Sequence, residues 1–419
     1  MPLDEVVQTS TVEVLKHPDG KYVNQYQFVR QLGKGQHGEV FQALDRQNNR
    51  MVVRAIKQVK RKNPKIDRMS QLRRKNLPSS PHVPLTDNLG TTEHKIRKEI
   101  AIMKKCRHPH VVRLLEVIDD KLDKSIYMVM EYLGGGEIKW RTPDDRPTLR
   151  VSQIRRICRD VILGLEYLHN QGIIHRDIKP ANLLWTEDRR MVKIADFGVS
   201  HFSYAQRLAA ASSSARKGGQ DRDSDLDPLL MDDSDLSKFA GTPMFLAPEI
   251  VYDSSSVVSS NANTPGEASS AGESQAGSST PTLRKPPITK AIDVWAFGVT
   301  LYGLLFGHLP FRGSNEFQIY NMIRTEDWDV PETMGSDEMP TGGRHPDWEK
   351  AKNDERYIEG YWAVDLLEKL LTKDVGRRIT LDGVKVGSYL LFHAHIPSYL
   401  VHITTFTDYM RALYSAIHG

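Results

Sequence analysis

The sequence contains only two cysteines, Cys106 and Cys158, among 419 residues. This scarcity excludes a disulfide-stapled secreted scaffold and predicts a protein of a reducing compartment without structural disulfides. Long hydrophobic runs are also absent. The most apolar stretch, residues 294–309, is short and interrupted by glycines. We therefore expect no membrane-spanning helix, no membrane partner and no secretory signal.

An excess of charge of one sign is missing as well. The formal net charge is +4, and the surplus of lysine and arginine is concentrated in residues 60–75, so nothing predicts nucleic acid binding. What the chain does have is length and 39% hydrophobic residues, enough for two lobes around a large core. Residues 253–287 are rich in serine, alanine and glycine and are expected to be disordered, because they cannot bury enough apolar surface.

The residues that carry chemistry gather within residues 175–198, where Asp177 is followed by Lys179 and Asn182, and later by Asp196. Transfer of a phosphoryl group requires little covalent chemistry, so catalysis reduces to aligning two oxygens and neutralising charge. Asp177 would accept the proton of the attacking hydroxyl, and Lys179 would balance the moving charge. Asn182 and Asp196 are oxygen ligands of the kind that Mg²⁺ prefers. Either one taken alone more often caps a turn, but the joint pattern disfavours that interpretation.

A glycine-rich segment lies near the N-terminus, where Gly33, Gly35 and Gly38 stand between two strand-like runs. Glycines let backbone amides approach phosphate oxygens closely. The same spacing also fits a dinucleotide-binding turn or a flexible hairpin. A dinucleotide fold would continue into a helix, whereas this chain continues into a second strand and a third, residues 51–59, which carries Lys57. The context favours a phosphate-binding hairpin.

Together these motifs resemble the signature of protein kinases. The resemblance implies an α+β, bilobal protein-kinase fold, with a small antiparallel sheet and one main helix in the N-lobe and a larger, mostly helical C-lobe. It also implies ATP and Mg²⁺ as cofactors. Lys57 would hold the α- and β-phosphates and pair with Glu99, which flanks the apolar stripe of an amphipathic helix over residues 94–105.

The same resemblance assigns further residues to the site. Glu249 would form a structural ion pair with Arg378. Asp293 would anchor the catalytic loop from a buried helix, with a plain helix-start aspartate as the alternative. The nucleotide pocket would be lined by Leu32, Gly33, Gly35, Gly38, Val40, Ala55, Lys57, Glu131, Leu133 and Leu184, with Met130 at its back.

Three segments, residues 99–105, 108–120 and 194–200, resemble calcium/calmodulin-dependent protein kinase kinases and the fungal kinases that activate the AMP-activated kinase. That group also carries a basic, proline-containing insert ahead of its main helix, here at about residues 61–92. The resemblance implies phosphorylation of a downstream kinase at its activation-loop threonine.

Specificity for serine and threonine follows from the same resemblance. Thr242 is similar to the threonine that contacts the catalytic aspartate and lysine in serine/threonine kinases, here Asp177 and Lys179. A pseudokinase or scaffold that only binds is the alternative, and it predicts the loss of at least one residue essential for transfer. All four such residues are present: Lys57, Asp177, Asn182 and Asp196.

The expected organisation is an N-terminal tail (residues 1–25), a small lobe (26–133), a large lobe (134–395) with an acidic insert (about 205–236) and a disordered insert (about 253–287), and a C-terminal tail (396–419). The basic insert has three interpretations: a solvated loop, a docking element for acidic partner surfaces, or a nuclear-import patch. We expect a cytoplasmic protein, with a nuclear location left open by that insert.

Residues 402–419 contain one arginine and no lysine, so the chain does not support a calmodulin-binding helix, which should be basic and amphipathic. The expected partners are protein substrates, and the sequence leaves the oligomeric state open.

Overall fold

The computed structural model describes residues 5–18, 20–35, 38–46, 51–62, 92–204, 207–208, 240–251, 288–344 and 354–387. The expected basic, acidic and serine-rich inserts lie almost entirely outside the described residues, and the C-terminal tail lies wholly outside them.

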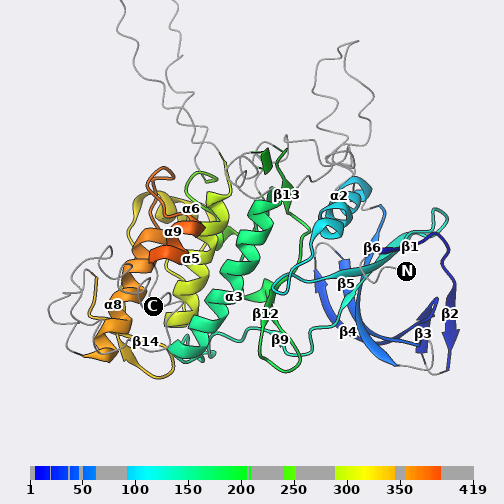
Figure 1. Cartoon of the computed structure of the whole chain (residues 1–419), viewed down its shortest axis with the longest axis horizontal. Helices are drawn as coiled ribbons and strands as arrows, with labels where there is room; N and C mark the ends of the chain where they lie inside the picture. Colours follow the sequence, from blue (N-terminus) through cyan, green and yellow to red (C-terminus); the bar gives the residue numbers. More distant parts are fainter. Residues whose placement is uncertain are drawn as a thin grey trace, which may run out of the picture.

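The predicted bilobal α+β architecture is confirmed (Figure 1). One end of the molecule is a curled sheet accompanied by a single helix, α2 (Thr92–Lys105). The other end is a cluster of helices, of which α3 (Val151–Asn170) lies nearest the middle of the molecule (Figure 1). A continuous apolar core runs from the inner face of α2 into the helical lobe.

The large sheet has eight strands, and all of its neighbouring pairs are antiparallel except the first, β1 with β7. In spatial order the strands are β1 (Val7–Thr9), β7 (Leu114–Ile118), β8 (Ser125–Glu131), β6 (Val52–Lys60), β5 (Gly38–Asp45), β4 (Tyr26–Gly35), β3 (Gly20–Val23) and β2 (Val14–His17). The hairpin β4–β5 is the predicted glycine-rich one. Gly38 has a φ of +128°, and a Cβ there would stand 2.6 Å from the Gln58 carbonyl oxygen, so only glycine fits.

The sheet begins earlier in the chain than the sequence predicts. Residues 7–23, expected as part of a tail, supply the three strands β1, β2 and β3. Strand β1 is held by a partner far away in the sequence, because Val7 pairs with Glu116 on β7. The buried Glu116 carboxylate also accepts hydrogen bonds from the hydroxyls of Thr9 and Tyr26. These contacts make the segment an integral edge of the small lobe.

Helix α2 forms where its apolar periodicity predicts it. Ile96, Ile100 and Met103 are all buried against the sheet, as the stripe requires. Acidic Glu93 in the first turn and basic residues in the last turn both stabilise the helix through their interaction with its dipole. The folded chain also reaches further into the expected insert than predicted, because Thr92 is already helical and Arg61 belongs to the small lobe.

The helical lobe is organised around α5 (Ala291–Phe306), which is buried on all sides. Its sequence is apolar apart from Asp293 and Thr300, as expected for a helix enclosed by other helices. The helix ends at Gly307, which has a φ of +75° and leaves no room for a Cβ beside the Arg146 backbone. Helix α8 (Glu355–Leu370) begins after Asp354, whose side chain caps it by accepting from the Arg356 amide.

The remaining elements are short. They are β9 (Gly136–Glu137), β10 (Ile173–Ile174), η2 (Pro180–Asn182), β11 (Leu183–Trp185), β12 (Val192–Ile194), β13 (His201–Phe202), η6 (Pro243–Phe245), α6 (Glu316–Thr325), β14 (Thr333–Met334), β15 (Met339–Pro340) and α9 (Leu381–Gly387). Among the described residues, no helix combines the length and apolar character needed to span a bilayer.

The predicted ion pair between Glu249 and Arg378 is present and lies inside the helical lobe. Two parallel bonds join the groups, Nη1 to Oε1 at 2.7 Å and Nη2 to Oε2 at 2.9 Å. The two side chains are 1% and 0% exposed, and the guanidinium also donates to the Ala291 and Thr372 carbonyls. The pair therefore fixes the end of the segment after Thr242 to the start of α5.

Replacing Arg378 with methionine should destabilise this lobe by about 3–5 kcal/mol, because the substitution leaves the Glu249 carboxylate buried without its partner. Denaturant unfolding followed by circular dichroism measures the loss. The neighbouring Arg377 is exposed, so Arg377→Met is the matched control and should change stability by less than about 0.5 kcal/mol. Equal losses in the two variants would contradict a structural role for the pair.

Candidate active site

Lys57, Glu99 and Asp196 meet where the two lobes face each other. The Lys57 ammonium lies 2.6 Å from Glu99 Oε1 on α2 and 3.1 Å from Asp196 Oδ1. Lys57 and Glu99 are only 6% and 5% exposed. The ion pair predicted across the long sequence gap is thus formed, and the same lysine reaches the loop that carries Asp196.

The electrostatics of this cluster hold Lys57 in its charged form. Burial by itself would lower the pKa of the Lys57 ammonium, but the carboxylates of Glu99 and Asp196 outweigh that effect and raise the pKa above its ordinary value. The ammonium is therefore a fixed positive charge at neutral pH. A fixed charge of this kind is suited to holding the phosphates of a nucleotide.

Asp177 lies at the centre of a second cluster, in which every predicted partner is present. Its Oδ1 accepts hydrogen bonds from the Thr242 amide at 3.1 Å and the Thr242 hydroxyl at 2.7 Å. Its Oδ2 accepts from the Asn182 amide at 2.9 Å and lies 2.8 Å from the Lys179 ammonium. Lys179 also donates to the Thr242 hydroxyl at 2.6 Å. The carboxylate is held in one orientation by three side chains.

Asp293 anchors the backbone of the loop that carries Asp177. Its carboxylate accepts hydrogen bonds from the amides of His175 and Arg176, both at 2.8 Å, and contacts His169 Nε2 at 2.9 Å. Asp293 is completely buried on α5. The alternative of a plain helix-start aspartate is wrong, because the side chain is spent on the loop and provides no N-cap.

Two residues of the site adopt left-handed backbone conformations that are uncommon outside glycine. Arg176 has a φ of +70° and Asp196 a φ of +64°. Such conformations cost about 1–3 kcal/mol each and persist where the surroundings determine them. Here the Asp293 bonds fix Arg176, and Lys57 contacts Asp196. One of these residues therefore directly precedes Asp177, and the other is Asp196 itself.

His175 is a supporting residue that we did not single out from its motif. Its Nδ1 accepts from the Asp177 amide at 3.3 Å, and its Nε2 donates to the Ala195 carbonyl at 3.2 Å, which fits the neutral tautomer with the proton on Nε2. Its ring also meets that of buried Phe197 edge to face, with centroids 5.0 Å apart. His175 therefore links the loop of Asp177 to the loop of Asp196. Its place two residues before Asp177 was the sequence feature that could have indicated this role.

The residues predicted to bind the nucleotide come from both lobes. Strands β4, β5 and β6 and the last residue of β8 supply most of them, Leu133 follows β8, and β11 supplies Leu184. Ala55 and Leu133 are buried, Val40 and Leu184 are partly buried, and Leu32 is exposed. Gly33 and Gly35 have open space where a Cβ would stand, so their backbone is accessible.

Glu131 has a contact that the sequence did not predict. Its carboxylate is paired with the Lys193 ammonium through both oxygens at 2.8 Å, and it accepts from the Arg113 amide. The side chain therefore joins the end of β8 to β12. Strand β8 leads into the connection between the lobes. Its backbone amide is engaged as well, because the Glu131 amide donates to the Arg113 carbonyl at 3.1 Å.

The donor set fits a magnesium ion held jointly with phosphates. Asn182 uses its amide nitrogen to donate to Asp177, which leaves the amide oxygen as the atom that could act as a ligand. Asp196 adds a carboxylate that is 42% exposed. Mg²⁺ usually takes only one or two protein oxygens and completes its shell with water and phosphate. Within the described residues no group of three or more acidic, histidine or cysteine side chains forms a protein-only metal site.

Replacing Asp293 with asparagine should destabilise the protein by about 3 kcal/mol, because an amide supplies one acceptor where two amides and a histidine need the carboxylate. Burial alone would raise the pKa of Asp293, but the bond and charge of His169 lower it below its ordinary value. The carboxylate therefore stabilises the fold above about pH 4, and that contribution is lost as acid protonates it. Urea unfolding between pH 3 and pH 7 measures both effects.

The control for that substitution is Asp354→Asn at the start of α8. Asparagine caps helices as well as aspartate does, so stability should change by less than about 0.5 kcal/mol. A wild-type stability at Asp293→Asn would show that the anchor contributes nothing.

Comparison with known proteins agrees with this geometry. A family model described as the protein kinase domain matches residues 26–264 and 278–390. The serine/threonine-protein kinase ssp1 of Schizosaccharomyces pombe is 38% identical over 371 residues, which are 88% of this chain and 43% of that protein. SNF1-activating kinase 1 of Saccharomyces cerevisiae is 35% identical over 406 residues, which are 94% of this chain and 30% of that protein.

The serine/threonine-protein kinase TOS3 of Saccharomyces cerevisiae is 30% identical over 415 residues, which are 96% of this chain and 60% of that protein. The chain thus spans less than two thirds of each of these relatives. The family model, however, covers every site residue placed above. The chain belongs to the family of proteins with a protein kinase domain.

Proposed function

We propose that this chain transfers the γ-phosphoryl group of ATP, with Mg²⁺, to serine or threonine hydroxyls of protein substrates. The observation that carries the proposal is the fixed orientation of Asp177, whose two oxygens are held by Thr242, Asn182 and Lys179. A carboxylate locked in this way presents a single direction from which a hydroxyl proton can be accepted. Its clustering with the other predicted residues supports transfer rather than simple binding.

The two lobes divide the work of aligning the reactants. Lys57, fixed by Glu99, would hold the α- and β-phosphates, while the glycine-rich hairpin would cover them with backbone amides. Asn182 and Asp196 would hold Mg²⁺, which neutralises charge on the phosphates when bound. Lys179, which contacts both Asp177 and Thr242, would balance negative charge as it moves between the oxygens.

Specificity for serine and threonine is supported by the Lys179–Thr242 contact and by the names of the relatives. The finer proposal is that the substrate is the activation-loop threonine of another kinase. It is supported by the relative named SNF1-activating kinase 1, whose matched region covers almost all of this chain.

Replacing Asp177 with asparagine should lower the rate of phosphoryl transfer by about 10²–10⁴-fold, because an amide keeps the shape of the carboxylate but cannot accept the proton. The assay incubates purified protein with Mg²⁺-ATP and inactive kinases of the SNF1 type and follows phosphate incorporation. The affinity for Mg²⁺-ATP should change far less than the rate. Mass spectrometry should locate the phosphate on the activation-loop threonine.

Two controls separate the parts of this proposal. Asp382→Asn changes an exposed aspartate in the first turn of α9 and should leave the rate unchanged. A substrate whose activation-loop threonine is replaced by alanine should no longer be labelled. Equal labelling by wild type and Asp177→Asn would overturn the catalytic assignment. Labelling of the alanine substrate would overturn only the proposal that the activation-loop threonine is the site of phosphorylation.

A further inference from the structure

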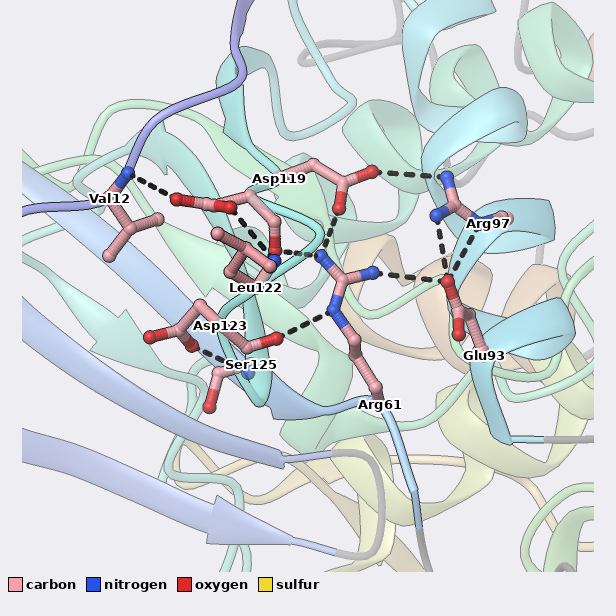
Figure 2. Close-up of polar contacts among 9 residues, drawn as sticks. Val12, Arg61, Glu93, Arg97, Asp119, Leu122, Asp123 and Ser125 are labelled. Atoms are coloured by element: carbon pink, nitrogen blue, oxygen red, sulfur yellow. Dashed lines mark hydrogen bonds and ion pairs between the residues drawn. The ribbon is translucent and has the colours of Figure 1, made fainter.

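Among the described residues of the small lobe, Arg61 stands out because its guanidinium makes four hydrogen bonds. It follows β6 directly, and Figure 2 shows its guanidinium reaching toward both α2 and the loop between β7 and β8. Its Nε donates to the Asp123 carbonyl at 2.9 Å, and its Nη1 lies 3.0 Å from Glu93 Oε1. Its Nη2 donates to the Asp119 carboxylate and, at 2.6 Å, to the Asp120 carbonyl.

Arg97 completes a closed ring of alternating charges with the same two carboxylates. Its Nη2 lies 2.7 Å from Glu93 Oε1, one helical turn earlier, and its Nη1 lies 3.0 Å from Asp119 Oδ2 (Figure 2). Each cation of the ring, Arg61 and Arg97, contacts both anions. An isolated surface ion pair contributes little, but a network with this geometry holds each member in one place.

The burial of Arg61 gives its contacts weight, whereas the side chains of Glu93 and Arg97 are 38% and 39% exposed. The Arg61 side chain is only 10% exposed, although it carries a charge. Burial would raise the pKa of the Asp119 carboxyl, but the bond from Arg61 and the charge of Arg97 lower it below its ordinary value. A buried guanidinium persists only when its donors are satisfied, and here all three of its nitrogens are engaged.

The loop that supplies the acceptors is itself braced. Asp120 and Asp123 accept from the amides of Leu122 and Ser125 within the loop. The N-terminal segment adds a second support. The Asp119 amide donates to the Thr9 carbonyl at 2.8 Å, and the Val12 amide donates to Asp120 Oδ2. Figure 2 shows the Val12 amide directed at this loop. The strands that were expected to be a tail therefore help to fix the surface on which Arg61 and Arg97 rest.

The ring lies at a distance from the Lys57–Glu99 ion pair along both the strand and the helix. Lys57 lies on β6 and Arg61 lies four residues later, one residue past the end of that strand, a span of about 13 Å for extended backbone. Glu93 and Glu99 are six residues apart on α2, a rise of about 9 Å. Strand and helix are thus joined at two separated points, Lys57 to Glu99 and Arg61 to Glu93. One attachment would let the helix swing, whereas two attachments define its direction.

We propose that Arg61 and Arg97 are positioning residues that lock the first two turns of α2 to the β7–β8 loop and so hold Glu99 within reach of Lys57. The proposal rests on the proposed phosphoryl-transfer function only for its kinetic readout. Neither arginine touches the reacting atoms. Their effect on the rate should pass entirely through Glu99.

The test is a double-mutant cycle on the full chain that combines Arg61→Met with Glu99→Gln. In the wild-type background, Arg61→Met should lower kcat/KM for Mg²⁺-ATP by about tenfold, a typical size for a residue that acts through a coupled neighbour. In the Glu99→Gln background the same substitution should change it by less than twofold. Single-turnover measurements at high enzyme concentration keep the slow variants measurable.

The matched control is Arg46→Met, an arginine of the same lobe that contacts Gln27 and Tyr22 and lies away from α2. It should leave kcat/KM unchanged in both backgrounds. Arg61→Lys should recover only part of the activity, because an ammonium cannot span the acceptors that a planar guanidinium reaches. Losses that simply add in the cycle, or no loss in Arg61→Met, would overturn the proposal.

Hydrogen exchange separates this proposal from the proposed function. Amides of α2 should exchange faster in Arg61→Met than in wild type or Arg46→Met, while amides of α3 keep their protection. If wild type transfers no phosphate to any substrate, the proposed function fails, yet faster exchange in α2 would still support the positional role. Unchanged exchange in α2 would contradict that role whatever the activity.

Discussion

The buried ion pair between Lys57 and Glu99 is the contact on which the rest of the site depends. Two charges removed from water are costly unless their geometry is good and each has further partners. Lys57 meets this condition through Glu99 and Asp196 together, so strand β6, helix α2 and the loop of Asp196 must all be in place at once. The ion pair therefore forms only when the small lobe is correctly arranged. The Arg61 ring is a second attachment, which joins the end of β6 to α2.

In the helical lobe, helix α5 holds the loop that carries Asp177 in place. Asp293 on α5 fixes the backbone at His175 and Arg176, and Thr242 then fixes the carboxylate of Asp177. The helical lobe thus holds a fixed proton acceptor, Asp177, and the small lobe holds a fixed cation, Lys57. Asp196 is the point at which the halves meet, since it contacts Lys57 while its backbone continues from the strand beside the catalytic loop.

Residues whose chemistry demands a particular type at a particular spacing could be predicted from the sequence. Lys57, Asp177 and Asp196 belong to this class, and the resemblance of their motifs to those of protein kinases implies the two-lobed fold. Arg61 and strand β1 could not be predicted in the same way, because their partners lie far along the chain. In the sequence, Arg61 is one member of a basic run, and only the fold brings Glu93, Asp119 and Asp123 around it. Strand β1 is short and half exposed, and its pairing with residues 116–118 leaves no local pattern.

The most direct measurement of the central claim is the phosphoryl-transfer rate of Glu99→Gln beside that of wild type, with thermal unfolding of both. The account predicts a rate lower by about 100-fold, because a misplaced Lys57 no longer holds the phosphates in line. The unfolding of the helical lobe should be unchanged, since the ion-pair partner of Glu99, Lys57, belongs to the small lobe. A wild-type rate in Glu99→Gln would contradict the claim that this ion pair organises the site.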